Sequence, residues 1–444
     1  MTTTNRSGAS TGGHAGVLGF DDAGEGEAPL DMAALVELGR ATMAKSFRQA
    51  PIVFTRGEGC YLWDAEGRRY LDFVGGLAVN GLGHSHPRIV EAVSDQIRTL
   101  VHVSNLYFNE PAIRLSKRLS DEFQRATGGP ARVFLCNSGT EATEAAMKLA
   151  RRYAYAVKKE PQRNVIVSFE HSFHGRTYGA MTVTGQPKYQ EGFGPIVPGV
   201  RYASFNDLAS VEAVMGPDVC AVFVEPIQAE GGLFPAAPGF LRGLRELCDR
   251  HGALLCLDEV QVGCGRTGRF FAFETHDVRP DVVWLAKALG AGIPIGAMLC
   301  SEATSDGFAP GSHGTTFGGN AFAAQVALTV LEVFEEDGIL DNVRETGATL
   351  NHELTRLSER FDVLTGPRGV GLIQGLGFRE EWAFATADAC MKRGLLVNKL
   401  NTKTLRFLPP LIAQKAHVRA AVELLSDALG EVKRNPPTQE GKPS

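Results

Sequence analysis

Lys287 is placed where its side-chain amine could act as a nucleophile. It follows an apolar run at 282–286 and precedes a glycine-containing turn at 288–292. The run is typical of a buried strand, and desolvation at the end of such a strand lowers the pKa of a lysine. The neutral amine is then free to form a Schiff base with a carbonyl compound. The alternative interpretation of a single lysine is a solvated surface residue.

Asp258 is a second candidate, because it follows the apolar run at 253–257 and precedes Glu259. A carboxylate at a buried strand end needs a cationic partner, since an unpaired buried charge is unfavourable. A protonated pyridine nitrogen would be such a partner, and the pair would keep the ring an electron sink. A helix cap and a metal ligand are the alternative interpretations.

The segment 134–141 runs from an apolar strand into a helical pattern. Ser138 and Glu141 have the spacing of a capping box, and Gly139 lies between them. A glycine allows close approach of the backbone, and the free amides of a helix N-terminus attract anions. A phosphate could therefore bind here, although an ordinary helix cap explains the same pattern.

Short apolar runs alternate with helical patterns between residues 132 and 300. The spacing predicts strands at 133–136, 165–168, 219–224, 254–257, 282–285 and 296–300, with a crossover helix that ends near Gly252. Strands alternating with helices indicate an α/β fold with a mostly parallel central sheet covered by helices. Ligands of such sheets bind beyond the carboxyl ends of the strands, where both Asp258 and Lys287 are expected.

The two ends of the chain are predicted to form a smaller α+β domain. The predicted boundaries are a disordered tail at 1–30, an N-terminal part of the small domain at 31–85, a large domain at 86–330, a C-terminal part of the small domain at 331–434, and a second tail at 435–444.

Composition excludes several other classes of protein. The 444 residues carry 45 Lys and Arg against 50 Asp and Glu, so a net charge of -5 gives no broad positive field for nucleic acid. We also find no apolar stretch long enough to cross a membrane and no secretion signal. The eight cysteines are scattered and lie partly in apolar runs, which favours reduced thiols in a cytoplasmic protein.

Six motifs in order resemble the class III aminotransferases of the fold-type I pyridoxal-phosphate enzymes. They lie at 137–142, 172–177, 225–232, 258–268, 286–292 and 311–320, and the resemblance extends from about residue 48 to residue 429. The resemblance implies a pyridoxal 5'-phosphate cofactor and a homodimer. It also implies these roles: Lys287 as anchor and acid-base catalyst, Asp258 at the pyridine nitrogen, Gly139 and Thr140 at the phosphate, Phe173 and Val260 against the ring, Gln261 at the 3-hydroxyl, and Thr316 at the phosphate of the partner subunit.

Further segments at 82–87, 104–111, 185–190, 205–207 and 406–410 resemble, within this family, the branch that acts on acetylornithine in arginine biosynthesis. That similarity implies that Arg176 binds the α-carboxylate of the donor and that Thr315 contacts the donor. Arg406 would receive the α-carboxylate of glutamate or 2-oxoglutarate, and Glu230 would be a gate that covers Arg406. A planar guanidinium suits such bidentate binding of a carboxylate.

Three residues bear on the choice of substrate. Ala229 stands where the family usually has glycine, and Thr315 stands where it usually has serine. Phe47 lies near the place of a tyrosine that helps ornithine aminotransferases bind an unacylated donor. A phenyl ring lacks that hydroxyl, which favours an acylated ornithine.

Several alternative functions remain open at this point. Other class III enzymes act on succinyl-diaminopimelate, succinylornithine, ornithine or 4-aminobutyrate. An aminomutase would need no external oxo acid, and a non-catalytic cofactor-binding protein could keep the fold. A zinc hydrolase would use His84 and His86, but no matching cluster of cysteines or carboxylates accompanies them, so we interpret 84–87 as a loop before a helix and predict no metal site.

Overall fold

The computed structural model describes residues 31–437 and divides into two units, Met1–Val53 and Phe54–Ser444. In the first unit, helix α1 (Met32–Thr42) begins at Asp31, whose carboxylate accepts a 2.7 Å hydrogen bond from the amide of Ala34. The predicted tail at 1–30 lies outside the described residues. So does 438–444, which is most of the second predicted tail.

A seven-stranded sheet forms the centre of the second unit. Its strand order is β4-β12-β11-β10-β7-β5-β6, and only β12 runs antiparallel to its neighbours. The strands are β4 (Ala131–Cys136), β5 (Val165–Phe169), β6 (Val200–Ala203), β7 (Val219–Val224), β10 (Leu254–Asp258), β11 (Val282–Leu285) and β12 (Gly296–Ser301). The predicted mostly parallel sheet is confirmed. Strand β6 was not predicted, because it is a short, half-buried edge strand that Arg201 interrupts.

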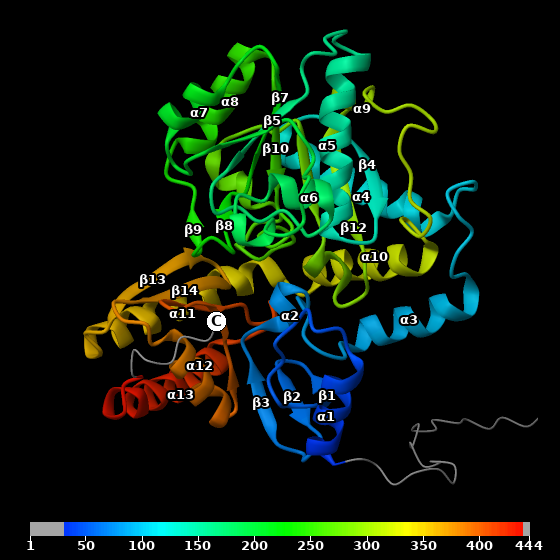
Figure 1. Ribbon diagram of the computed structural model, residues 1–444. Helices are drawn as coiled ribbons and strands as arrows, with labels where there is room; N and C mark the ends of the chain where they lie inside the picture. Colours follow the sequence, from blue (N-terminus) through cyan, green and yellow to red (C-terminus); the bar gives the residue numbers. More distant parts are fainter. Residues whose placement is uncertain (1–30, 438–444) are drawn as a thin grey trace, which may run out of the picture. The chain divides into compact units, whose positions relative to one another are not determined.

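Helices cover both faces of this sheet, because alternate residues of each strand point to opposite sides. Trp284 packs with the alanine-rich helix α5 (Gly139–Ala156), whereas Val283 and Leu285 belong to the core on the opposite face. Figure 1 shows the sheet with helices around it. That opposite core includes buried side chains of α4 (Glu110–Thr127), α8 (Phe240–His251) and α10 (Ala321–Glu336). Burying one such large apolar side chain contributes roughly 1.5–3 kcal/mol.

Shorter elements complete this part of the chain. They are α3 (Pro87–Thr99), α6 (Tyr178–Val183), α7 (Leu208–Val214), α9 (Glu302–Ser305), the 3-10 turns η1 (Pro187–Tyr189), η2 (Ala272–His276) and η3 (Lys287–Gly290), and the two-stranded ribbon of β8 (Ile227–Gln228) and β9 (Phe234–Pro235).

Segments from the two ends of the second unit share a sheet. Strand β15 (Leu395–Leu396) pairs in parallel with β3 (Arg69–Asp72), next to β2 (Tyr61–Asp64) and β1 (Phe54–Glu58). A second, antiparallel sheet and three helices follow α10. They are β13 (Leu364–Val370), β14 (Ile373–Phe378), β17 (Thr404–Phe407) and β16 (Asn398–Asn401), with α11 (Ile339–Arg360), α12 (Ala383–Lys392) and α13 (Lys415–Arg434). The exact domain boundaries stay a prediction.

Candidate active site

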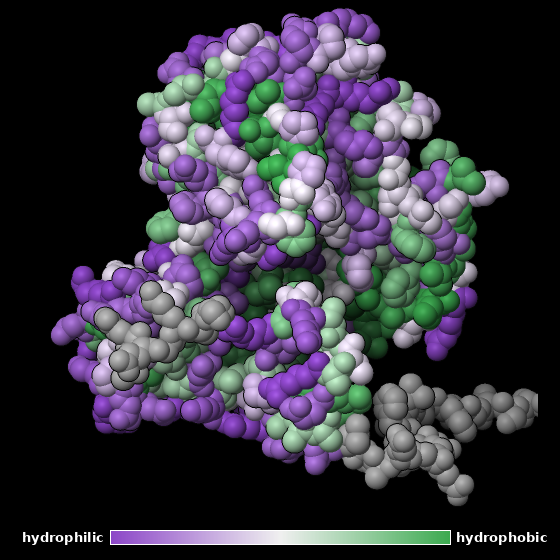
Figure 2. All heavy atoms as spheres, in the orientation of Figure 1, coloured by the Kyte–Doolittle hydropathy of each residue, from purple (hydrophilic) through white to green (hydrophobic). Residues whose placement is uncertain are grey.

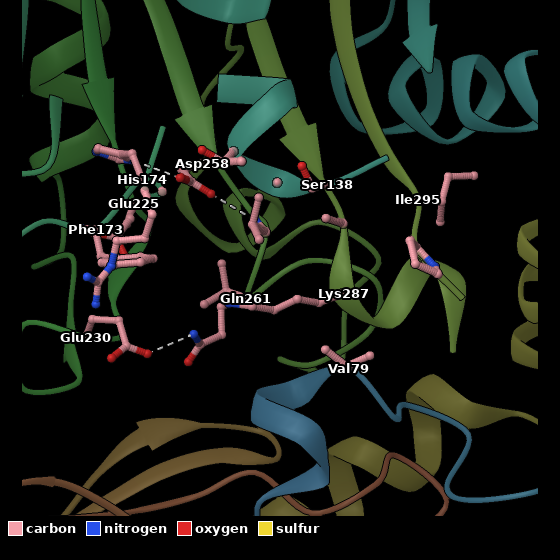
Figure 3. Close-up of a pocket in the computed structure, with 18 of the residues that line it drawn as sticks. Val79, Ser138, Phe173, His174, Glu225, Glu230, Asp258, Gln261, Lys287 and Ile295 are labelled. Carbon is pink, nitrogen blue, oxygen red and sulfur yellow. Dashed lines mark hydrogen bonds and ion pairs between the residues drawn. The ribbon is translucent and has the colours of Figure 1, made fainter. Parts of the chain in front are cut away.

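Four strands of the central sheet end at one cavity of about 440 Å³. Residues directly after β4, β7, β10 and β11 line it, and Val79, which follows helix α2 (Gly75–Ala78), closes the opposite side (Figure 3). Nine of the predicted site residues are in its wall: Gly139, Thr140, Phe173, Arg176, Glu230, Asp258, Val260, Gln261 and Lys287. A ligand site beyond the carboxyl ends of the strands was expected from the sheet alone.

Lys287 begins the turn η3 directly after β11, with a left-handed backbone at a φ of 45°. A residue other than glycine in this region is strained by about 1 kcal/mol or more, and such strain concentrates at functional sites. Burial lowers the pKa of the Lys287 amine from 10.5 to about 8, while the charge of Glu230 opposes that shift. A substantial fraction of the amine is therefore neutral near neutral pH, as a nucleophile requires.

Asp258 is held by a histidine to which the sequence motif gave no role. The Nδ1 atom of His174 lies 2.7 Å from Oδ2 of Asp258, and both side chains are buried. The other carboxylate oxygen accepts a 3.0 Å hydrogen bond from the amide of Val260. Glu259 points away, because its carboxylate accepts hydrogen bonds from the amides of Ala272 and Phe273. Asp258 is thus the one of the two acids that lines the cavity.

Helix α5 begins at the cavity with only the Ser138 half of the predicted capping box formed, because the Glu141 carboxylate binds the amide of Asn137 rather than that of Ser138. The hydroxyl of Ser138 accepts a 3.3 Å bond from the amide of Glu141, whose carboxylate accepts a 2.5 Å bond from the amide of Asn137. Within residues 31–437, no acceptor is bonded to the amides of Gly139 and Thr140. A Cβ atom at Gly139 would lie 2.8 Å from a methyl carbon of Val260, so only glycine lets the helix start approach the cavity floor.

These groups fit pyridoxal phosphate. The cavity holds a lysine amine with a pKa of about 8, a carboxylate at a strand end, and free amides at a helix N-terminus. Phe173 and Val260 add apolar surface between these groups. The individual contacts predicted for Phe173, Val260 and Gln261 stay predictions.

Arg406, on β17, lies in a closed network next to the cavity. Its Nη1 atom donates to Glu230 at 2.6 Å, to the side-chain oxygen of Gln261 at 2.8 Å and to the carbonyl of Ala229 at 3.0 Å. Burial is the largest single influence on the pKa of Glu230 and would raise it. The charge and hydrogen bond of Arg406, the charge of Lys287 and the hydrogen bond from Gln261 together outweigh burial, so the pKa lies below its usual value. Gln261 also donates to Glu230 at 3.3 Å (Figure 3). Three predicted site residues, Arg406, Glu230 and Gln261, thus form one network.

Arg176 has a different environment. Its guanidinium carbon lies 3.9 Å from the centre of the Tyr189 ring and 5.6 Å from that of Phe173. No ion pair or hydrogen bond joins its guanidinium to another residue in the described part of the chain. Its donors are therefore available to a ligand, as a carboxylate-binding residue requires.

Thr315 and Thr316 line a separate cavity of about 310 Å³, together with His313 and Phe317. The hydroxyl of Thr315 accepts hydrogen bonds from Asn137 at 3.3 Å and from the amide of Gly318 at 3.1 Å. The structure thus brings neither threonine into the wall of the main cavity. Phe47 belongs to the first unit, where its ring is exposed.

Two cavity residues, His174 and Glu225, were missed as site residues. Glu225 accepts hydrogen bonds from the amides of Phe173 at 3.0 Å and Ala229 at 3.4 Å. Burial, and then the charge of Asp258, raises the pKa of Glu225 well above its usual value. Both residues lie inside the motifs quoted above, but only the fold shows which of their neighbours they contact. His84 and His86 lie apart: His84 bonds Asp72 at 2.8 Å, and His86 precedes helix α3 as expected.

The family model for aminotransferase class-III matches residues 42–429. The chain belongs to this family. It is 46% identical over 394 residues to an acetylornithine aminotransferase of Xanthomonas axonopodis pv. citri, covering 88% of this chain and 96% of the relative. It is 45% identical over 372 residues to a succinylornithine transaminase of Salmonella typhimurium, covering 83% and 90%.

A solved structure agrees with this assignment. The ornithine aminotransferase of Toxoplasma gondii matches with a TM-score of 0.87 and 31% identity over 91% of this chain and 95% of its own, and it is described with partial occupancy of pyridoxal phosphate at its active site. The predicted fold and cofactor are confirmed. The chain is a pyridoxal-phosphate-dependent aminotransferase, and no helix within residues 31–437 is long and apolar enough to cross a membrane.

Proposed function

We propose that the enzyme transfers the terminal (δ) amino group of N2-acetyl-L-ornithine to 2-oxoglutarate, giving N-acetylglutamate 5-semialdehyde and L-glutamate, as a step of arginine biosynthesis. The observation that carries the proposal is the contrast between two arginines at the cavity. Among the described residues no group pairs with the donors of Arg176, whereas Glu230 covers Arg406. The name of the Xanthomonas relative supports the same reaction.

Pyridoxal phosphate, when bound, withdraws electrons from the substrate carbon that bears the amino group. Lys287 anchors the cofactor and then, through Nζ, moves a proton to and from that carbon, for which a pKa of about 8 is suitable. Asp258, oriented by His174, keeps a proton on the ring nitrogen. The free amides of Gly139 and Thr140 hold the phosphate group.

The two arginines suit two substrates that use one cavity in turn. N2-Acetylornithine has one carboxylate, which binds Arg176 while Glu230 stays on Arg406. 2-Oxoglutarate has two carboxylates, so one displaces Glu230 and binds Arg406 while the other binds Arg176. The exchange replaces one ion pair by another and leaves no buried charge unpaired.

Acylation of the donor removes a charge that the site would repel. Free ornithine carries an α-ammonium group next to the carboxylate that Arg176 binds, and no described carboxylate is paired with Arg176 to neutralise it. The α-ammonium group and the guanidinium of Arg176 would both be positive and would repel each other. N2-Succinylornithine satisfies the same requirement and is the second candidate, which the Salmonella relative favours.

Product analysis tests the reaction type. The enzyme is incubated with N2-acetylornithine with and without 2-oxoglutarate, and the aldehyde and glutamate are quantified by mass spectrometry. We expect equal amounts of both products and repeated turnover only when 2-oxoglutarate is present. Sustained turnover without the oxo acid would identify an aminomutase, and no reaction with either acylated ornithine would overturn the proposal.

We further propose that the active form is a homodimer in which Thr316 acts in the site of the partner subunit. Apolar side chains gather on the surface over α3 and the segment after it (Figure 2). Leu106, Phe108 and Phe317 are 84%, 93% and 61% exposed. The side chain of Asn105, in the segment after α3, donates to the carbonyls of Thr315 and Gly318, both at 3.0 Å. These bonds join that segment to the one that contains Thr316. Exposed apolar surface of this kind is typical of a subunit interface.

Subunit mixing tests the shared site. Lys287→Ala and Thr316→Ala homodimers should each be weak or inactive, but a mixed dimer contains one site with both residues intact. We expect mixing under dissociating conditions to restore a substantial part of the activity. Failure of mixing to restore any activity, although mixed dimers form, would place Thr316 in its own subunit's site.

We also propose a cytoplasmic location. All eight cysteines are buried, and none of them forms a disulfide. Buried free thiols are typical of a reducing compartment. Cell fractionation followed by immunoblotting tests this, and recovery in the membrane or secreted fraction would contradict it.

A further inference from the structure

Tyr189 provides an aromatic platform for Arg176. The 3.9 Å distance between the guanidinium carbon and the ring centre is the shortest cation-ring contact among the described residues. The same ring packs edge to face against Phe173, with ring centres 5.7 Å apart and an angle of 82° between the ring planes. Arg176 is therefore held by aromatic surface rather than by a carboxylate.

Two glutamines fix this platform. Tyr189 ends the short turn η1, and Gln186 and Gln190 flank that turn. Gln186 donates to the carbonyls of His171 at 3.2 Å and Ser172 at 3.0 Å. Gln190 donates to the carbonyls of Met181 at 3.2 Å and Thr184 at 3.1 Å. The turn is thus tied to the segment on both sides of Arg176, so the ring and the arginine keep a constant relative position.

A stacked guanidinium keeps its donors free at the edge. The ring covers one face of the plane, but the N–H groups lie in the plane and remain available to a carboxylate. Because Arg176 is exposed and its guanidinium makes no polar contact among residues 31–437, the ring of Tyr189, which lies nearer than that of Phe173, restricts its rotamers before a substrate arrives. Restricting a long side chain in advance reduces the entropy lost on binding.

We propose that Tyr189 is a positioning residue that sets the preference of this enzyme for donors with a carboxylate remote from the reacting amine. It acts through Arg176, and the inference rests on the proposed role of Arg176. The aromatic ring of Tyr189 holds Arg176 in position, and the Tyr189 hydroxyl does not contribute to this. Lys188 also lies near the ring, at 4.7 Å, but its side chain is on the exposed side of the turn.

The test compares two donors that differ only in the carboxylate. N2-Acetylornithine and its decarboxylated analogue N-acetylputrescine are mixed separately with holoenzyme, and the loss of cofactor absorbance is followed. We expect Tyr189→Leu to lower kcat/KM for N2-acetylornithine about 3- to 30-fold and to leave that for N-acetylputrescine unchanged. Tyr189→Phe should match the wild type with both donors. A structural role would lower both rates together, which would overturn the proposal.

A binding measurement gives a readout that does not depend on turnover. N2-Acetyl-L-norvaline lacks the amine but keeps the carboxylate, and calorimetry of the holoenzyme measures its Kd. We expect Tyr189→Leu to weaken this binding by about the same factor and the exposed control Tyr155→Leu to leave it unchanged. An unchanged Kd in Tyr189→Leu would contradict the proposal. If Tyr189→Leu does not fold, Tyr189→Met is measured in the same way.

Arg176→Ala separates this inference from the proposed function. If Arg176→Ala leaves the Kd of N2-acetyl-L-norvaline unchanged, the proposed role of Arg176 is wrong and the inference about Tyr189 is wrong with it. If Arg176→Ala weakens binding but Tyr189→Leu does not, only the inference about Tyr189 is wrong.

Discussion

Arg406 and Arg176 serve the same cavity with the same functional group, but the chain holds them in opposite ways. Arg406 is only 1% exposed, and it donates hydrogen bonds to Glu230, Gln261, Asn398 and the carbonyl of Ala229. Arg176 is exposed and lies on the ring of Tyr189, and no residue in the described part of the chain binds its donors.

The difference shows how one site can accept ligands with one or two carboxylates. A carboxylate reaches Arg176 without displacing any protein group. At Arg406 it must replace Glu230, and it must restore the ion pair, because leaving a buried charge unpaired costs roughly 3–5 kcal/mol. The covered arginine therefore discriminates between substrates, whereas the open arginine binds both.

Loss of Lys287 should have the largest effect, because Lys287 moves the proton in both half-reactions, with the amino donor and with the oxo acid. Lys287→Ala should lower the single-turnover rate with donor and with oxo acid by on the order of 10⁴-fold. Stopped-flow absorbance measures both rates. A variant that keeps a tenth of either rate would show that the proton is moved by another group.

Arg406→Ala should affect the half-reaction with 2-oxoglutarate but not the half-reaction with the amino donor. We expect kcat/KM for 2-oxoglutarate to fall by about 10²- to 10³-fold, which corresponds to roughly 3–5 kcal/mol for breaking a buried pair. The half-reaction with N2-acetylornithine should change little. Arg393→Ala is a suitable control, since it breaks a surface pair with Glu431 and should alter neither half. Equal loss in both halves would remove the distinction between the two arginines.

The Arg406 network also acts on the charge of Lys287. The rate at which cofactor-free enzyme takes up pyridoxal phosphate should rise about tenfold between pH 7 and 9 and then level off, because only the neutral amine reacts and its pKa is about 8. Glu230→Gln removes a negative charge that raises this pKa, so its midpoint should lie at lower pH. Absorbance after mixing measures the rate. A wild-type rate that still rises about eightfold from pH 9 to 10 would indicate an ordinary, solvated lysine with a pKa of 10.5.

The smallest effect is expected from removing the Glu230 carboxylate that pairs with Arg406. Glu230→Ala should lower the KM for 2-oxoglutarate about three- to tenfold, since a single ion pair with one partly accessible side chain no longer competes. The preference for N2-acetylornithine over glutamate as donor should narrow correspondingly. Steady-state kinetics with both donors measure this change. An unchanged KM would mean that Glu230 does not cover Arg406 in solution.

The sequence predicts the positions of the main catalytic groups better than their partners. Lys287 and Asp258 lie at strand ends because apolar runs precede them, and the parallel sheet brings those ends together. By contrast, Asp258 and Glu259 are neighbours in the chain, and only the fold shows that the side chain of Asp258 lines the cavity while that of Glu259 points away from it. The contacts of His174 with Asp258 and of Tyr189 with Arg176 join segments that no periodicity connects.

Donor choice tests the central claim most directly. Holoenzyme is mixed separately with N2-acetylornithine, N2-succinylornithine, succinyl-diaminopimelate, ornithine and 4-aminobutyrate, and the first-order loss of cofactor absorbance is compared across concentrations. We predict that N2-acetylornithine reacts with the highest kcat/KM and that ornithine is slower by at least about tenfold, because its α-ammonium is repelled by Arg176. A faster reaction with ornithine would contradict the account, because ornithine keeps the α-ammonium group that acylation removes, and a faster reaction with 4-aminobutyrate would show that the site does not select an acylated α-amine.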